Sequence, residues 1–250
     1  MKIAVCVSHV PDTATRIKIG SDRKSIDSTG VTYIINPYDE FAVEEALKTK
    51  EIFSDDTQVF VLSVGSEANK ETIRKALAMG CDEAVLLKDD SSRDSFGIAK
   101  ALSEEIKSLG CELVFLGKQS VDYDNSIVGQ ILAEMLNYNC IPVVVDFKIE
   151  GNKIIAEREI EGGKEVVESE LPAIITTQKG LNEPRYASLK GIMAAKKKTI
   201  TEKTPEPFNN FTELIEMNLP LSKQPGRIIG TDSSAVPELV KLLREEAKVI

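Results

Sequence analysis

Four short segments of the chain combine residue types and positions that suit the binding of a nucleotide. Each lies at the end of an expected strand or at the start of an expected helix. In open parallel sheets, ligands lie beyond the carboxyl ends of the strands, and helix N-termini bind phosphates. We therefore expect a binding site there, although no P-loop or G-x-G-x-x-G sequence is present. The four segments are Cys6–His9, Asn36–Asp39, Ser63–Ser66 and Gly117–Gly129.

The histidine and the cysteines do not indicate catalytic or metal chemistry. His9 is the one histidine, and no cysteine or carboxylate is spaced around it as in a catalytic triad. A surface or interface role is the simpler interpretation. The four cysteines are far apart, form no C-x-x-C pair and lie in or beside apolar runs, so we expect buried thiols. They are Cys6, Cys81, Cys111 and Cys140.

Strands and helices alternate through the first half of the chain, which predicts βαβ units and a mostly parallel sheet with helices on both faces. Residues 11–35 are irregular, with turn signals and a possible hairpin. Asn36 is the expected cap of a helix opening at Pro37, and Ser66 of another. The expected strands are 2–8, 59–63, 83–87 and 113–116, and the later helices are 67–79, 95–109 and 126–136.

The second half of the chain changes character. Three consecutive strand-like runs, separated by Gly-Asn and Gly-Gly turns, predict an antiparallel extension of the sheet. They cover 143–149, 153–160 and 164–170, and an apolar strand over 171–177 and a helix from about Leu189 follow. Residues 201–250 are rich in proline and predict an arm with a final helix over 235–246, capped by Ser233 or Ser234. We therefore expect a 1–200 α/β nucleotide-binding domain and a 201–250 arm that packs on its own domain or on another chain.

Composition excludes several function classes. The formal charge of −9 argues against nucleic acid, whose phosphates need a basic surface. No run of about 18 apolar residues exists, so we expect no membrane insertion. The first residues go directly into an apolar strand without the features of a signal or transit peptide. The simplest expectation is a cytoplasmic protein of a prokaryote.

Several motifs, in the same order, are similar to those of the β subunit of electron transfer flavoproteins. The resemblance runs from Met1 to about Ile200, and it implies the α/β fold of the adenine-nucleotide α-hydrolase type. Its most specific part is a polar loop and short helix at 181–198. The other motifs are Ile35–Glu40, Gly117–Asp122 and Glu157–Gly163.

This resemblance implies that the subunit holds AMP at the four segments named above. Asn36 would bond an adenine edge or ribose, and Ser126 with the backbone N–H groups opening the helix would meet the phosphate. Val128 and His9 depart from the family pattern, which has threonine and a basic residue there. The implied AMP residues are Cys6, Asn36, Pro37, Tyr38, Asp39, Val64, Gly117, Lys118, Gln119, Ser120, Val121, Asp122, Tyr123, Asp124, Asn125, Ser126, Ile127 and Val128.

The resemblance also implies an electron carrier without catalytic residues of its own. Its FAD would lie mainly in an α subunit, and electrons would pass from acyl-CoA or related dehydrogenases, as in fatty acid β-oxidation, to a quinone reductase. Leu189 would anchor the dehydrogenase, with Tyr186, Ile192 and Met193 beside it; the alternative is that Leu189 is a core residue. Glu159 would pair with the mobile flavin domain, or else belong to an ordinary charged strand face.

Two other readings of the sequence remain. In the bifurcating branch of the family a second FAD replaces AMP, with Gly-Arg-Gln-x-x-Asp-Gly-Asp-Thr in the fourth motif. This chain has Gly117-Lys118-Gln119 and Tyr123-Asp124-Asn125 there, and it keeps Asn182–Tyr186, so AMP is favoured, whereas Pro11–Thr13 points weakly to the second FAD. A stand-alone adenine-nucleotide sensor would explain the α/β core but neither the 181–198 loop nor the arm.

Overall fold

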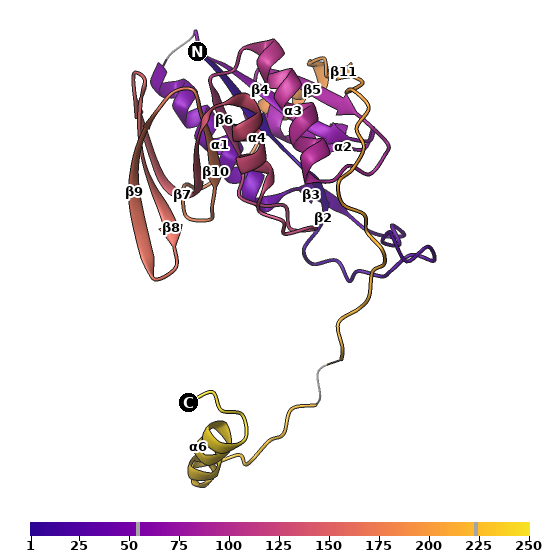
Figure 1. Ribbon diagram of the computed structural model, residues 1–250, viewed down its shortest axis with the longest axis vertical. Helices are drawn as coiled ribbons and strands as arrows, with labels where there is room; N and C mark the ends of the chain where they lie inside the picture. The colour runs from indigo at the N-terminus through magenta and orange to yellow at the C-terminus, as the bar shows by residue number, and fades with distance from the viewer. Residues whose placement is uncertain (54–55, 223–224) are drawn as a thin grey trace.

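The computed structural model describes residues 1–53, 56–222 and 225–250. Its main feature, among these residues, is a nine-stranded sheet in the order β11-β5-β4-β1-β6-β10-β7-β8-β9 (Figure 1). The strands from β11 to β7 are parallel, and β8 and β9 are antiparallel. Their bounds are β1 Lys2–Cys6, β4 Gln58–Gly65, β5 Glu83–Lys88, β6 Leu113–Gly117, β7 Asn139–Glu150, β8 Lys153–Ile160, β9 Gly163–Glu170, β10 Ala173–Thr177 and β11 Thr201–Lys203.

Helices cover both faces of the sheet. One apolar core lies under α1 (Pro37–Phe53), α2 (Asn69–Met79) and α5 (Leu189–Lys197), and the other lies under α3 (Ser95–Leu109) and α4 (Val128–Leu136). Alternate residues of β1 enter opposite cores, as expected for a strand buried on both faces. The predicted α/β class, the parallel sheet and the antiparallel extension are therefore confirmed.

The excursion before α1 contains a small second sheet. β2 (His9–Pro11) pairs antiparallel with β3 (Tyr33–Ile35), and Ile19 bridges Ile26 within the intervening turn region. This pairing agrees with the predicted hairpin. It also places the turn region at the carboxyl end of the sheet, because β2 continues directly from β1.

Three helix starts differ from the sequence-based expectation. α2 begins at Asn69, because Ser66 accepts a hydrogen bond from Ala68 N in a turn before the helix. α4 begins at Val128 rather than Ser126, since Ser126 adopts a left-handed conformation with φ of 54°. α6 (Val236–Glu245) follows a 3₁₀ turn capped by the Asp232 side chain, not by a serine.

The C-terminal arm departs from the core later than expected. β11 adds a parallel edge strand next to β5, so the sheet extends to Lys203. After β11 the arm first follows the core, where Phe211 N donates to Asp94, and it then runs away from the sheet and ends in α6, of which no residue is buried (Figure 1). Residues 223–224 of the predicted arm lie outside the described residues. Within the described residues, no helix is long and apolar enough to cross a membrane.

Candidate functional site

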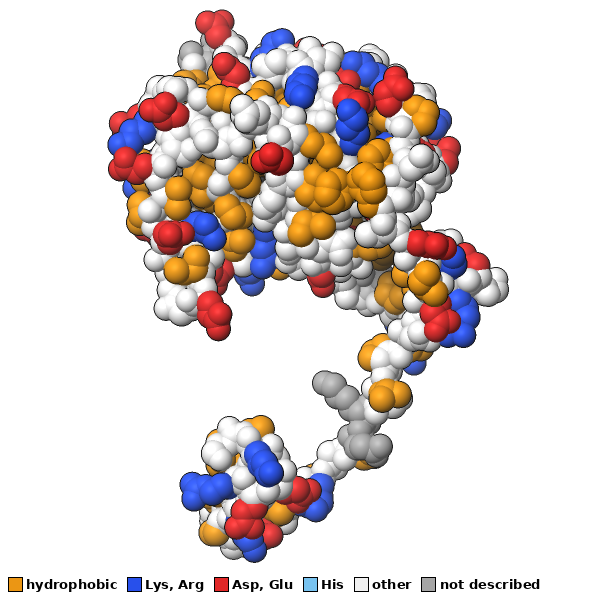
Figure 2. Space-filling model, in the orientation of Figure 1, with side chains coloured by type: hydrophobic (Ala, Val, Ile, Leu, Met, Phe, Trp, Pro, Cys, Tyr) orange, Lys and Arg blue, Asp and Glu red, His pale blue; other side chains and the backbone are white. Residues whose placement is uncertain are grey.

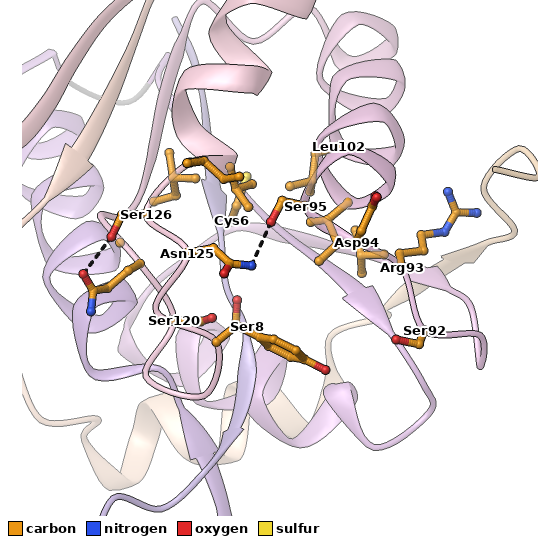
Figure 3. Close-up of a pocket in the computed structure, with 18 of the residues that line it drawn as sticks. Cys6, Ser8, Ser92, Arg93, Asp94, Ser95, Leu102, Ser120, Asn125 and Ser126 are labelled. Carbon is orange, nitrogen blue, oxygen red and sulfur yellow. Dashed lines mark hydrogen bonds between the residues drawn. The ribbon is translucent and has the colours of Figure 1, made fainter. Parts of the chain in front are cut away.

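A cavity of about 890 Å³ lies at the carboxyl ends of β1, β4 and β6, between the N-terminal ends of α3 and α4 (Figure 3). Most of the residues implied for AMP line it, and the elements that bring them together are far apart in the chain. Those on the wall are Cys6, Asp39, Val64, Gly117, Lys118, Gln119, Ser120, Tyr123, Asn125, Ser126, Ile127 and Val128. Those not on the wall are Asn36, Pro37, Tyr38, Val121, Asp122 and Asp124.

A buried polar hub holds the cavity floor in place. The Asp39 carboxylate accepts hydrogen bonds from Ser8 N at 2.7 Å, Gly117 N at 2.9 Å and Asn36 Nδ2 at 2.9 Å. These bonds join the ends of β1 and β6 to the start of α1. Burial nevertheless raises the pKa of Asp39 to about 7. Only glycine fits at Gly117, because a Cβ would collide with the Asp39 carboxylate and with Tyr38.

The Asn36 side chain serves this hub and is not free to read a nucleotide. It is 1% exposed. Its Nδ2 donates both to Asp39 and to Gln119 O at 2.9 Å, and its Oδ1 accepts from Val121 N at 3.2 Å. The expected bond from Asn36 to an adenine edge or ribose would break these contacts. The amide instead fixes the segment that follows β6.

The 119–128 loop supplies the polar side of the cavity. Ser126 Oγ donates to Gln119 Oε1 at 2.8 Å, and Asn125 Nδ2 donates to Ser95 Oγ at 3.1 Å (Figure 3). α4 begins without a side-chain cap, and Ile127 and Val128 at its start are on the cavity wall. The first N–H groups of a helix have no partner within the helix. This edge can therefore donate hydrogen bonds to an anion.

The opposite side of the cavity is apolar and includes residues that the sequence analysis missed. Leu62, Val64 and Leu116 come from the strands, and Ile98 and Leu102 from α3. The loop before α3 could have been found by the rule applied to the other loops, since it follows β5. No sequence signal indicated that the arm would line the cavity. The wall also includes Ser8 and Ser63, from two of the segments expected to form the site. The polar and arm residues that were missed are Lys24, Ser92, Arg93, Asp94, Ser95 and 210–214.

His9 is held by contacts with other side chains. Of the four cysteines, Cys6, Cys81 and Cys111 are buried as expected, whereas Cys140 is half-buried. His9 Nδ1 lies 2.8 Å from Thr72 Oγ1, and its ring stacks on Tyr33. Burial lowers the pKa of His9. Cys6 is buried against the cavity floor, where burial raises the pKa of its thiol. Among the described residues, no group of three or more His, Cys, Asp or Glu side chains is arranged to hold a metal ion.

The 181–188 loop is held against α1 by ion pairs and by hydrogen bonds from a side-chain amide. Arg185 donates from Nε and Nη2 to the buried Glu44 carboxylate at 2.8 and 2.9 Å, and from Nη1 to Glu51 at 2.7 Å. Asn182 Nδ2 donates to Phe41 O at 3.0 Å and to Glu45 at 2.9 Å. The backbone is thereby held against the protein while the tip of the loop remains free.

The tip of this loop carries large apolar side chains into solvent. Tyr186 is 99% exposed and Leu189, the first residue of α5, is 82% exposed. Met193 and Ile192, about one turn further on, are also exposed. In this chain Leu189 is therefore not a core residue. Ser188 caps α5 by accepting from Gly191 N at 3.0 Å, which fixes the direction of Leu189.

Comparison with known proteins shows the family to which the chain is related. The sequence model described as electron transfer flavoprotein domain matches residues 24–207. Relatives named electron transfer flavoprotein subunit beta include those of Bradyrhizobium diazoefficiens and Bacillus subtilis, each 38% identical over the full length of both chains. The chain belongs to the electron transfer flavoprotein family, among its β subunits. A mitochondrial relative from Oryza sativa subsp. indica is 36% identical, also over both full lengths.

The match to the electron transfer flavoprotein domain includes most of the features described above. It covers Asn36–Asp39, the 117–128 loop and the 181–188 loop, and stops at residue 207, before the arm segment that lines the cavity. It also covers Glu159, which is exposed on β8 and accepts from Gln178 Nε2 at 2.9 Å. The family resemblance inferred from the motifs is confirmed.

Proposed function

We propose that this chain is the β subunit of a heterodimeric electron transfer flavoprotein and that its cavity holds AMP. The observation that carries the proposal is the two-sided cavity, with apolar side chains from β4, β6 and α3 facing the uncapped start of α4. The apolar side suits a base, and the helix start suits a phosphate. Ser126, Gln119 and Lys118 supply further polar groups on the wall.

These residues fit AMP as a bound structural nucleotide. The backbone N–H groups of Ile127 and Val128, together with Ser126, would hold the phosphate. These donors would replace the threonine hydroxyl that is missing at Val128. Lys118 Nζ lies over the Tyr38 ring and adds positive charge at the cavity. The redox chemistry would come from FAD, mainly in the α subunit. This chain's own part is to bind the nucleotide and to present surfaces to its partners.

Three surfaces would serve those partners. The exposed loop tip with Leu189 and Tyr186 would dock an acyl-CoA or related dehydrogenase, and electrons would leave to a quinone reductase. Glu159 would contact the flavin domain of the α subunit. The distal arm would lie on the α subunit, since Figure 2 shows apolar side chains along its length and around α6. We also propose a cytoplasmic location in a prokaryote, of which only the bacterial source has a counterpart among the relatives.

The nucleotide content of the purified αβ complex tests this proposal. After denaturation, chromatography should find one AMP and one FAD per heterodimer. Two FAD would place the chain in the bifurcating branch, for which the Pro11–Thr13 segment is the supporting observation. A β chain that purifies without an α subunit but with adenine nucleotide would instead support the stand-alone sensor.

A pair of glycine variants locates the nucleotide. Gly117→Ala should reduce bound AMP, because the added methyl group displaces Asp39 and the 117–121 segment. Gly163→Ala is the matched control, since nothing lies within 4 Å of a Cβ there. Equal AMP content in the two variants would contradict placement of AMP in this cavity.

A further inference from the structure

Part of the C-terminal arm lies on the wall of the cavity before the arm leaves the core. We call residues 206–218 the strap. Residues 210–214 of the strap lie on the wall of the same cavity as the 119–128 loop, on which the proposed nucleotide site depends. They follow the last residue matched by the electron transfer flavoprotein domain. The strap is therefore part of the enclosure of the site.

Asp94 joins the strap to the start of α3. Its Oδ1 accepts from Gly97 N at 2.9 Å and caps the helix. Its Oδ2 accepts from Phe211 N at 2.7 Å and Thr212 N at 3.1 Å. In return, Asn210 Oδ1 accepts from Asp94 N at 2.9 Å. Hydrogen bonds to a carboxylate are stronger than those between neutral groups, so this is a specific attachment.

Aromatic packing reinforces this attachment. Phe211 makes edge-to-face contacts with Phe96 and Phe208, with ring centroids 5.2 and 5.5 Å apart. Phe208 lies over Gly97, where a Cβ would collide with its ring. Arg93 Nη2 also donates to Glu206 O at 2.7 Å. The loop before α3 is thus shaped to receive the strap.

The far end of the strap is attached to the turn region between β2 and β3. Lys24, which is on the cavity wall, pairs with Glu213 at 3.0 Å. Met217 N donates to Arg23 O at 2.7 Å. Exposed ion pairs stabilise little, so this end is the weaker of the two. The strap accordingly spans the cavity between a strong and a weak attachment.

We propose that the strap is a further wall of the nucleotide site and controls nucleotide release, with Asp94 as its positioning residue. Nucleotide leaves when the strap detaches, beginning at the Lys24 side. Asp94 and the Phe208 contact oppose full detachment. The identity of the nucleotide as AMP rests on the function proposed above, whereas the closure of the cavity by the strap does not.

Release of radiolabelled AMP from the intact heterodimer into excess unlabelled AMP tests the proposal. Asp94→Asn and Phe208→Ala should each speed release by about tenfold, equivalent to about 1.4 kcal/mol. Phe208→Ala leaves the cap of α3 intact, so it separates loss of the strap from damage to the helix. Asp232→Asn is the matched control, because Asp232 also caps a helical turn but lies outside the cavity. Unchanged release in both strap variants, or equal acceleration in the control, overturns the proposal.

Alkylation of Cys6 provides a second readout that does not need AMP. Cys6 lies on the floor of the cavity and is buried. Mass spectrometry after treatment of the heterodimer with iodoacetamide should show faster modification of Cys6 in the strap variants than in wild type or Asp232→Asn. If the wild-type complex holds no AMP, the proposed function fails, and this measurement still decides the role of the strap. Cys6 modification that proceeds at a measurable rate and is equal in all forms refutes it.

Discussion

Replacing Leu189 with alanine should weaken dehydrogenase docking without weakening the fold. The side chain is 82% exposed, so a partner can bury nearly all of it. Full burial of a leucine stabilises by about 1.5–3 kcal/mol, which corresponds to an increase of about tenfold to a hundredfold in the KM for the heterodimer. Removing the side chain from the free protein should change the unfolding free energy by about 0.5 kcal/mol or less.

The assay is reduction of the heterodimer's flavin by a substrate-charged dehydrogenase over a range of heterodimer concentrations. Thermal unfolding and nucleotide content are measured on the same samples. Val166→Ala is a suitable control, because Val166 is 63% exposed on β9, at the edge of the sheet away from α2 and α5. A fall of several degrees in the melting temperature of Leu189→Ala, with unchanged KM for each dehydrogenase tested, would refute the docking argument.

Three further changes test other parts of the argument. Arg185→Ala should lower the unfolding free energy by about 2 kcal/mol, because it leaves the buried Glu44 carboxylate without its guanidinium, whereas Glu51→Ala should cost less than about 1 kcal/mol; urea unfolding compares them. Burial raises the pKa of Asp39 to about 7, so the folded protein holds this proton more tightly than the unfolded chain. As the pH falls from about 8 to about 6, the unfolding free energy of wild type should therefore rise by on the order of 1 kcal/mol relative to that of Asp39→Asn. A relative unfolding free energy that stays constant or falls over that range would contradict the assignment. Glu159→Ala should change electron-transfer rates with a partner at constant FAD and AMP content, and stopped-flow traces identical to wild type would leave Glu159 a surface charge.

The layered fold could be predicted because its signals are local. Apolar runs ended by glycine or proline, alternating with helical spacing, give the parallel sheet, and α3 and β8 have the expected bounds. β11 was missed because its three residues, Thr201–Lys203, are polar and pair only at a sheet edge. The start of α4 was misplaced because the left-handed conformation of Ser126 depends on tertiary contacts rather than on residue type.

The candidate site could be predicted only in part, since its geometry depends on contacts between distant segments. The loops at the carboxyl edge followed from a general rule of parallel sheets. The engagement of Asn36 with Gln119 and Val121 could not be inferred, because an asparagine amide serves a ligand and the backbone equally well. The pairing of Asp94 with Phe211 joins residues more than a hundred positions apart, and no periodicity marks it.

The anchoring of the 181–188 loop by Arg185 and Asn182 affects how fast the proposed partner complexes at this loop would form and dissociate. A loop already ordered in the free protein loses little conformational entropy when a partner docks, so encounters need not wait for a rearrangement. The contact surface at its tip is small, with Leu189 and Tyr186 as the main side chains. A complex formed there would therefore be weak and would dissociate fast. Under the proposed function, fast association combined with fast dissociation would let the protein bind one partner after another, and tighter binding at this tip would slow that exchange.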